Sequence, residues 1–150
     1  MELSRRTGGL KGSATLAITS EVGRLKAEGR QVFSFTAGQL DFPTPDYIKK
    51  EAIKAIEENF TLYTPVAGTP ELRKEIAAWT KERTGIEYHP DNILVSCGAK
   101  QSLYNVMQAV LQEGDECIIF APYWVSYPEM IKSTGEEPVV VQTLAEKRLV

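Results

Sequence analysis

The sequence predicts an α/β fold with a parallel-rich sheet flanked by helices. Three short apolar segments have the length of buried strands, at residues 93–95, 117–120 and 138–142. Between the first two, apolar residues recur on one helix face, at Leu103, Val106, Met107, Val110 and Leu111. A shorter helix, at residues 127–133, is expected between the last two. Strands joined through helices by short links run parallel, with right-handed crossovers.

Three helices are predicted in the first half of the chain, each with a recognisable start. The first is capped by Ser13 or Thr15 and stops at Gly29. The next two open with a threonine cap and a proline at the first helical position, at Thr44-Pro45 and Thr69-Pro70. The inward faces of the three helices are expected to be Ile18, Val22 and Leu25; Ile48, Ala52 and Ile56; and Leu72, Ile76 and Trp79. On the third helix, Glu71, Arg73, Lys74 and Glu75 are expected to face mostly outward.

The segments between these helices are predicted to form one strand and two loops. Residues 31–36 alternate enough, through Val32, Phe33 and Phe35, to suggest a short strand. The loops, at residues 37–45 and 59–68, contain prolines and glycines that interrupt any regular period. Further along, Gly114 is expected to end the helix that carries the apolar face.

The composition excludes several classes of function. The chain has 150 residues, a net charge of −3 and a pI near 5.3, and its basic residues are scattered. Such a surface does not attract a nucleic-acid backbone or an anionic membrane. No apolar run is long enough to span a bilayer, and the N-terminus lacks the apolar core of a secretory signal. The protein is therefore expected to be cytoplasmic.

Histidine and cysteine content exclude further chemistry. His89 is the only histidine and is expected to be exposed in a loop, so a histidine-rich metal site is excluded. Cys97 and Cys117 lie on separate predicted strands, and no Cys-x-x-Cys pair exists. They are expected to be buried free thiols, as in a reducing cytoplasm. No metal site is predicted.

The segment Cys97-Gly98-Ala99-Lys100-Gln101 carries the strongest functional signal. It leads from a predicted strand directly into a helix, whose free N–H groups and positive dipole end suit a phosphate. Lys100 adds a full positive charge. Tyr123 and Trp124 follow the next parallel strand, so they are expected at the same edge of the sheet. A flat aromatic beside a phosphate-holding turn indicates a flat phosphorylated ligand.

Short motifs along nearly the whole chain resemble those of one enzyme family, in the same order. They are Leu3-Ser4-Arg5-Arg6, Ser13-Ala14-Thr15-Leu16-Ala17, Ala37-Gly38, Asp41-Phe42-Pro43-Thr44-Pro45, Tyr63-Thr64-Pro65 with Gly68, Glu71-Leu72-Arg73, Gly98-Ala99-Lys100-Gln101, Gly114-Asp115-Glu116 and Pro122-Tyr123-Trp124-Val125-Ser126-Tyr127-Pro128. Each motif is weak alone, but the ordered set is specific. It resembles the N-terminal part of the fold-type I, class I/II aminotransferases that use pyridoxal 5′-phosphate (PLP), within the aspartate/prephenate branch.

The resemblance implies the aspartate aminotransferase-like fold. Residues 1–45 would form the N-terminal arm and part of the small domain, and residues 46–150 the first part of the large PLP-binding domain. Gly98, Ala99 and Lys100 would hold the PLP phosphate. Trp124 would stack on the pyridine ring and help to seat the substrate. Tyr63 would reach the phosphate in a partner subunit's site, which implies a homodimer with shared active sites.

The resemblance also implies substrate contacts. Gly38 would lie against the α-carboxylate, and Lys100 would meet the distal carboxylate of a dicarboxylic substrate. Lys11, Ser13 and Thr15 would belong to a segment that closes over the substrate and is linked to prephenate acceptance. The implied activity is amino-group transfer from aspartate, or from glutamate or prephenate-type dicarboxylates, to a 2-oxo acid.

Each of these residues also has a role that needs no ligand. Gly98 is a glycine of the kind that many strand-to-helix turns require. Trp124 and Tyr63 are compatible with simple packing, and Lys11 with solvation. A lysine in the first turn of a helix opposes the helix dipole, which favours an anionic partner for Lys100.

The family's Schiff-base lysine has no match in these 150 residues, so no catalytic residue is assigned, and it is expected beyond Val150. Alone, the chain is not expected to transaminate, because PLP chemistry needs that lysine. The open edge of a partial sheet is expected to make it unstable or prone to aggregation. Two alternatives remain. One is another fold-type I PLP enzyme, such as an aromatic aminotransferase or a carbon–sulfur lyase, and the other is a non-catalytic PLP-fold fragment.

Overall fold

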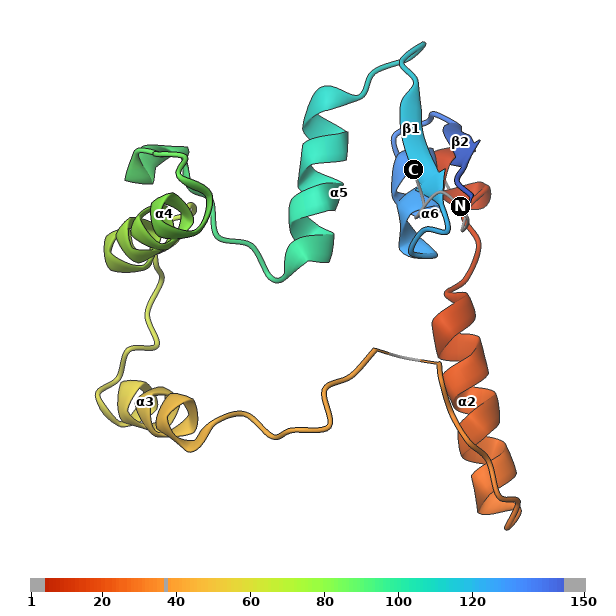
Figure 1. Ribbon diagram of the computed structural model, residues 1–150, viewed down its shortest axis with the longest axis horizontal. Coiled ribbons are helices and arrows are strands. Elements are labelled where there is room, and N and C mark those ends of the chain that lie inside the picture. Colours follow the sequence, from red (N-terminus) through yellow and green to blue (C-terminus); the bar gives the residue numbers. More distant parts are fainter. Residues whose placement is uncertain (1–4, 37, 145–150) are drawn as a thin grey trace. The chain divides into compact units, whose positions relative to one another are not determined.

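The computed structural model describes residues 5–36 and 38–144, and the chain divides into two compact units. One unit is Leu40–Ser102, and the other combines the residues up to Gln39 with those from Leu103 onward. The elements in chain order (Figure 1) are α1 (Arg5–Gly8), α2 (Ala14–Ala27), α3 (Asp46–Glu57), α4 (Pro70–Thr84), the 3-10 helix η1 (Pro90–Asn92), α5 (Ala99–Val110), β1 (Cys117–Ala121), α6 (Ser126–Lys132) and β2 (Pro138–Gln142).

The last third of the chain forms the predicted strand–helix–strand arrangement. β1 and β2 pair in parallel, with Cys117 opposite Pro138 and Ala121 opposite Gln142, and α6 lies between them in sequence. Ile119 of β1 is buried together with Met130 and Ile131 of α6. Apolar burial between α6 and the sheet therefore holds this unit, and the predictions of an α/β fold and of a parallel sheet are confirmed.

The helix α4 begins as its sequence predicts. The Thr69 hydroxyl accepts a hydrogen bond from the Leu72 N–H at 3.4 Å, and Pro70 occupies the first turn. The helix ends at Gly85, whose φ of 74° lies in the left-handed region. Its buried residue is Ala77, whereas Leu72 and Trp79 are exposed, so the predicted inward face of α4 is wrong for these two residues.

The start of α3 differs from the prediction. Pro45 occupies the N-cap position of α3, and no side chain caps this helix. The prediction that Thr44 caps it, with Pro45 as the first helical residue, is therefore wrong by one position. Pro45 has no N–H to satisfy, but its carbonyl accepts hydrogen bonds from the Ile48 and Lys49 N–H groups, which starts the helix without a hydroxyl cap. The predicted inward face of α3 is exposed in the described unit.

Two predicted strands are absent from the described residues. Residues 31–36 and 93–95 adopt no strand, and the described sheet consists of β1 and β2. A strand requires a neighbour to accept its backbone hydrogen bonds, and apolar alternation in the sequence does not supply one. The apolar helix α5 is confirmed, but it ends at Val110 instead of continuing to Gly114.

The first long helix, α2, also has the predicted cap. The Ser13 hydroxyl, not that of Thr15, accepts a hydrogen bond from the Leu16 N–H at 3.3 Å. Along α2, the Arg24 guanidinium pairs with Glu21, and this hydrogen bond lowers the pKa of the Glu21 carboxyl below its ordinary value. Both side chains are more than half exposed, so the effect of this pair on stability is small.

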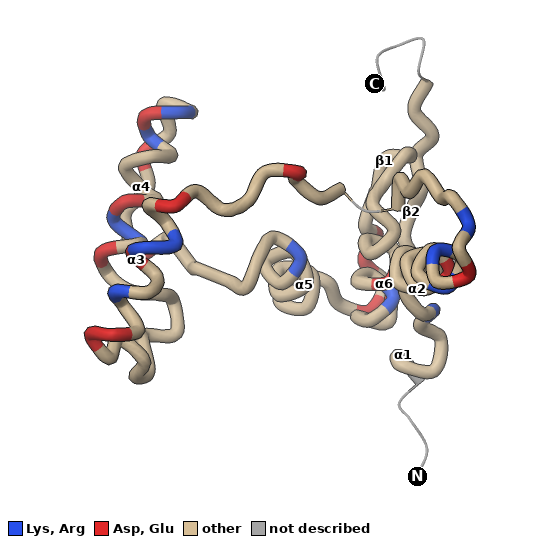
Figure 2. Tube along the Cα trace, turned by 90° about the horizontal axis from the view of Figure 1, so that it is seen from below, with Lys and Arg blue, Asp and Glu red and all other residues tan. Residues whose placement is uncertain are grey.

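Charges of both signs are interspersed along the surface helices. Figure 2 shows Lys and Arg mixed with Asp and Glu on α3 and α4. No helix among the described residues is both long enough and apolar enough to cross a membrane. Both cysteines are free thiols, as predicted, but Cys97 is exposed and Cys117 half-buried, so their predicted burial is wrong for Cys97. His89 is exposed, as predicted.

Candidate functional site

The segment before α5 forms a tight turn that ends at the helix N-terminus. Gly98 has a φ of 82°, which a residue with a side chain rarely adopts, and its N–H donates to the Ser96 carbonyl at 2.8 Å. The Cys97 N–H donates to the Gln101 side-chain oxygen at 2.5 Å. Both hydrogen bonds join residues within the turn and the first turn of α5, so they fix its local conformation. Residues 97–100 are exposed, so the start of α5 is accessible to a ligand.

The electrostatics of this turn suit an anion. Helix α5 begins at Ala99, and the first N–H groups of a helix have no acceptor within it. Lys100 is the one charged residue of α5, and Figure 2 shows the rest of that helix without charge. A positive side chain and a positive dipole end therefore coincide. The Ser96 hydroxyl oxygen is buried and has no hydrogen-bond partner among the described residues. Backbone donors, a cation and a glycine fit a phosphate group.

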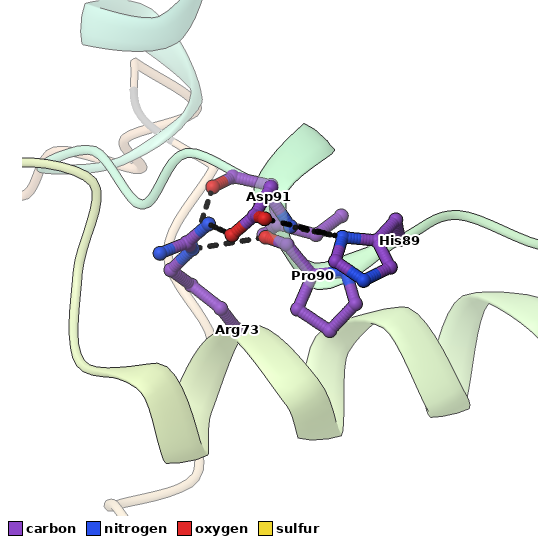
Figure 3. Close-up of polar contacts among 5 residues, drawn as sticks. Arg73, His89, Pro90 and Asp91 are labelled. Carbon is purple, nitrogen blue, oxygen red and sulfur yellow. Dashed lines mark hydrogen bonds and ion pairs between the residues drawn. The ribbon is translucent and has the colours of Figure 1, made fainter.

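A second feature holds the chain that leads into the turn. Arg73 of α4 donates from Nε to the Pro90 carbonyl at 2.9 Å and to the Ile93 carbonyl at 3.1 Å, and from Nη2 to Asp91 Oδ1 at 2.8 Å (Figure 3). The Arg73 side chain is 15% exposed. His89 lies beside Asp91 on the outer side of this cluster, and its Nδ1 accepts from the Asp91 N–H at 3.3 Å. Arg73 therefore joins α4 to η1 and to the residue that follows η1.

The loop that carries Tyr63 is connected to the same segment. The Val95 N–H donates to the Ala67 carbonyl at 3.0 Å. A Cβ on Gly68 would lie 2.7 Å from Val95 Cγ2, so Val95 packs directly on the glycine. Tyr63, on the same loop, is fully exposed. The structure therefore brings the Tyr63 loop and the approach to Gly98 together within one unit.

Trp124 belongs to the other unit, in the turn between β1 and α6. Its carbonyl accepts from the Tyr127 N–H at 3.0 Å, and its side chain is 44% exposed. An open hollow of about 450 Å³ is lined by residues 118–120 of β1 and by Pro122, Tyr123, Trp124 and Tyr127. Aromatic walls and an open side fit a flat ring stacked on Trp124.

The predicted substrate residues Lys11, Ser13 and Thr15 lie in the same unit as Trp124. The Lys11 N–H donates to Glu129 Oε2 of α6 at 2.8 Å, which attaches the N-terminal segment to α6. Ser13 caps α2, and Thr15 lies in its first turn. Gly38 lies in the loop after α2, with no atom within 4 Å of the position a Cβ would take. The preceding Ala37 of the predicted motif lies outside the described residues, as do Leu3 and Ser4.

Comparison with known proteins identifies the family. The family model of aminotransferase class I and II matches residues 30–149. The chain belongs to this family. A probable aspartate/prephenate aminotransferase of Thermus aquaticus is 43% identical over 148 residues, which cover 99% of this chain and 39% of the relative. An aspartate aminotransferase of Geobacillus stearothermophilus is 47% identical over 146 residues, or 97% of this chain and 37% of the relative.

Solved structures give the same result for the fold of this aminotransferase chain. An aspartate aminotransferase from Thermus thermophilus with maleate superposes with a TM-score of 0.95 at 41% identity, over 100% of this chain and 39% of that one. An alanine aminotransferase from Pyrococcus furiosus gives a TM-score of 0.90 at 28% identity. The predicted aspartate aminotransferase-like fold is confirmed. The chain spans well under half the length of these relatives.

Three residues near the site were not predicted from the sequence of this aminotransferase chain. Gln101 belongs to one of the motifs, but no role was predicted for its side chain, which accepts a hydrogen bond from the Cys97 N–H within the turn. Arg73 was expected to point outward on α4, yet it is nearly buried. No role was predicted for Glu129, whose carboxylate accepts a hydrogen bond from the Lys11 N–H. The available signal for Arg73 was its place in the Glu71-Leu72-Arg73 motif, whereas Glu129 had none beyond its charge.

Proposed function

We propose that this chain supplies the phosphate-holding and ring-covering part of a PLP-dependent aminotransferase. The observation that carries the proposal is the exposed start of α5 behind Gly98, with Lys100 as its one charged residue. The enzyme moves an amino group from aspartate, or from glutamate or a prephenate-type dicarboxylate, to a 2-oxo acid. Relatives named as aspartate and aspartate/prephenate aminotransferases support this assignment.

Cofactor binding divides between two parts of the chain. Gly98, Ala99 and Lys100 would hold the phosphate through the turn and the N-terminus of α5, and Trp124 would cover one face of the ring. When bound, PLP supplies an electron sink for bond cleavage at the α-carbon of the substrate. In this proposal, these residues bind and orient the cofactor and take no part in proton transfer. The small-domain assignment of residues 1–45 and the large-domain assignment of residues 46–150 belong to the same proposal.

Substrate selection rests on positive charge and on backbone access. In the proposed complex, the Lys100 ammonium pairs with the distal carboxylate of the substrate, and the open backbone at Gly38 receives the α-carboxylate. Lys11, Ser13 and Thr15 form the segment that closes over the substrate. The Thermus thermophilus relative was solved with maleate, a dicarboxylate, which supports a dicarboxylic substrate here.

The partner is a second copy of the same chain. The loop at residues 59–68 presents four exposed apolar side chains, Phe60, Leu62, Tyr63 and Val66. Contiguous apolar side chains on one loop favour an interface. In the proposed homodimer, Tyr63 reaches the phosphate of the partner's cofactor. The proposed location is the cytoplasm, which agrees with the two free thiols.

Amino transfer in an enzyme that carries this chain tests the substrate assignment. Oxaloacetate formation from aspartate and 2-oxoglutarate is measured with Lys100→Ala and compared with transfer from phenylalanine. Loss of a charged hydrogen bond costs about 1.5–3 kcal/mol, so kcat/KM for aspartate is expected to fall about 10- to 100-fold more than for phenylalanine. Equal losses for the two donors would contradict the carboxylate role.

The 150 residues by themselves are expected to show no transamination with added PLP. They contain no residue that matches the Schiff-base lysine of the family. Turnover of 2-oxoglutarate by the purified chain at enzyme-like rates would show that this part of the proposal is wrong.

A further inference from the structure

The segment between η1 and the turn lacks the support that a strand would have. Residues 93–96 pair with no strand among the described residues, although Gly98 depends on where this segment places it. Among the described residues, contacts from two other parts of the chain hold it instead. The Arg73 side chain binds its beginning at Ile93, and the Ala67 carbonyl binds its middle at Val95. The position of the turn therefore depends on these contacts.

The Arg73 contact requires a guanidinium. Nε–H is shared between the Pro90 and Ile93 carbonyls at 2.9 and 3.1 Å, while Nη2 reaches Asp91 at 2.8 Å (Figure 3). Nε and Nη2 present their donors side by side along one edge of the planar guanidinium, whereas a lysine ammonium concentrates its donors at a single point. Because the side chain is 15% exposed, its hydrogen bonds are poorly replaced by water.

The Val95 contact links the turn to the second loop. Val95 packs on Gly68 so closely that a Cβ there would meet Val95 Cγ2 at 2.7 Å. Gly68 ends the loop that presents Tyr63. The contacts of Arg73, Gly68 and Val95 therefore hold both residues 93–96, which lead to Gly98, and the end of the Tyr63 loop.

We propose that Arg73 is a positioning residue for the turn at residues 96–99, the proposed phosphate site. By holding the Pro90 and Ile93 carbonyls it sets the place of Gly98 and the start of α5, and through Val95 it sets the Tyr63 loop relative to that turn. The inference rests on the proposed function, because the phosphate is the ligand of the turn. Arg73 itself touches neither cofactor nor substrate.

The test measures phosphate affinity separately from folding. Inorganic phosphate is titrated into an isotope-labelled, cofactor-free enzyme that carries this chain, and the amide signals of Gly98 and Ala99 are followed by NMR. The variants are Arg73→Met, which removes every contact, and Arg73→Lys, which keeps only the charge. The matched control is Lys74→Met, which removes a positive charge from the next, exposed position of α4. Circular dichroism gives the folded fraction of each variant.

A loss of phosphate affinity is expected for the Arg73 variants and not for the Lys74 control. Arg73→Met is expected to weaken phosphate binding about tenfold, as happens at other sites when a residue that orients the ligand-binding groups is removed. Arg73→Lys is expected to restore little of this affinity. Lys74→Met changes the affinity less than about twofold, since an exposed charge on α4 is largely screened. Unchanged affinity in Arg73→Met, or a loss that merely follows the folded fraction, would overturn the inference.

The same titration separates this inference from the proposed function. A wild-type chain that binds no phosphate at Gly98 and Ala99 would refute both. Wild-type binding that Arg73→Met leaves intact would refute only the positioning role. If Arg73→Met does not fold, Arg73→Lys provides the second variant, because it keeps the positive charge but cannot reproduce the contact of one Nε–H with both carbonyls. It is expected to shift the Gly98 amide signal and to weaken phosphate binding several-fold, and a folded Arg73→Lys variant with unchanged signal and affinity would contradict the role.

Discussion

Replacing Gly68 by alanine is expected to destabilise the chain through two separate effects. Gly68 has a φ of 100°, and placing a residue with a Cβ in this region costs about 1–2 kcal/mol. The new Cβ would also lie 2.7 Å from Val95 Cγ2 and 2.9 Å from Val95 Cβ. Overpacking of this kind costs about 1–3 kcal/mol. The expected decrease in the free energy of unfolding is therefore about 2–5 kcal/mol, which is a large share of a domain's stability.

Urea denaturation followed by circular dichroism measures this change from the midpoint and slope. Gly135→Ala is the matched control, because Gly135 has a φ of 105° but no atom within 4 Å of the position that its Cβ would take. It is expected to show only the backbone cost. Adding Val95→Ala to Gly68→Ala is expected to recover part of the loss relative to Val95→Ala alone. Equal destabilisation by Gly68→Ala and Gly135→Ala would refute the packing argument.

Two further changes test contacts that hold the other elements. Thr69→Ala removes the α4 cap and is expected to cost about 1 kcal/mol in urea denaturation, whereas Thr44→Ala leaves stability unchanged because Thr44 caps no helix. Equal effects of the two would contradict the cap assignment. Glu129→Ala is expected to speed hydrogen exchange at the Lys11 amide, while Glu129→Gln, which keeps an acceptor oxygen, restores its protection. Unchanged Lys11 exchange in Glu129→Ala would show that the contact does not hold this segment.

The sequence predicted elements whose causes are local. Thr69 and Ser13 cap their helices because a hydroxyl needs only the next turn to find an N–H. The parallel pair β1 and β2 followed from two apolar segments joined through α6. The strands expected at 31–36 and 93–95 failed because a strand depends on a neighbour that no local pattern reveals.

In the candidate site, too, the local features could be predicted from the sequence and the long-range contacts could not. The Gly98 turn and its helix follow each other in sequence, so their geometry could be expected before it was seen. The contact between Lys11 and Glu129 could not, because 118 positions separate the two residues. Arg73 was misplaced because charged residues on a helix are usually exposed, and only the carbonyls of Pro90 and Ile93 explain its burial.

Binding of two cofactor analogues tests most directly whether the start of α5 holds a phosphate carried by a flat ring. Pyridoxamine 5′-phosphate and pyridoxamine, which lack the aldehyde that reacts with surface lysines, are each titrated into the labelled, cofactor-free enzyme that carries this chain. The phosphorylated compound is expected to bind at least about tenfold more tightly, since charge-assisted phosphate hydrogen bonds add more than about 1.4 kcal/mol, and to shift the Gly98 and Ala99 amide signals. Equal affinities, or shifts that spare these two amides, would contradict it.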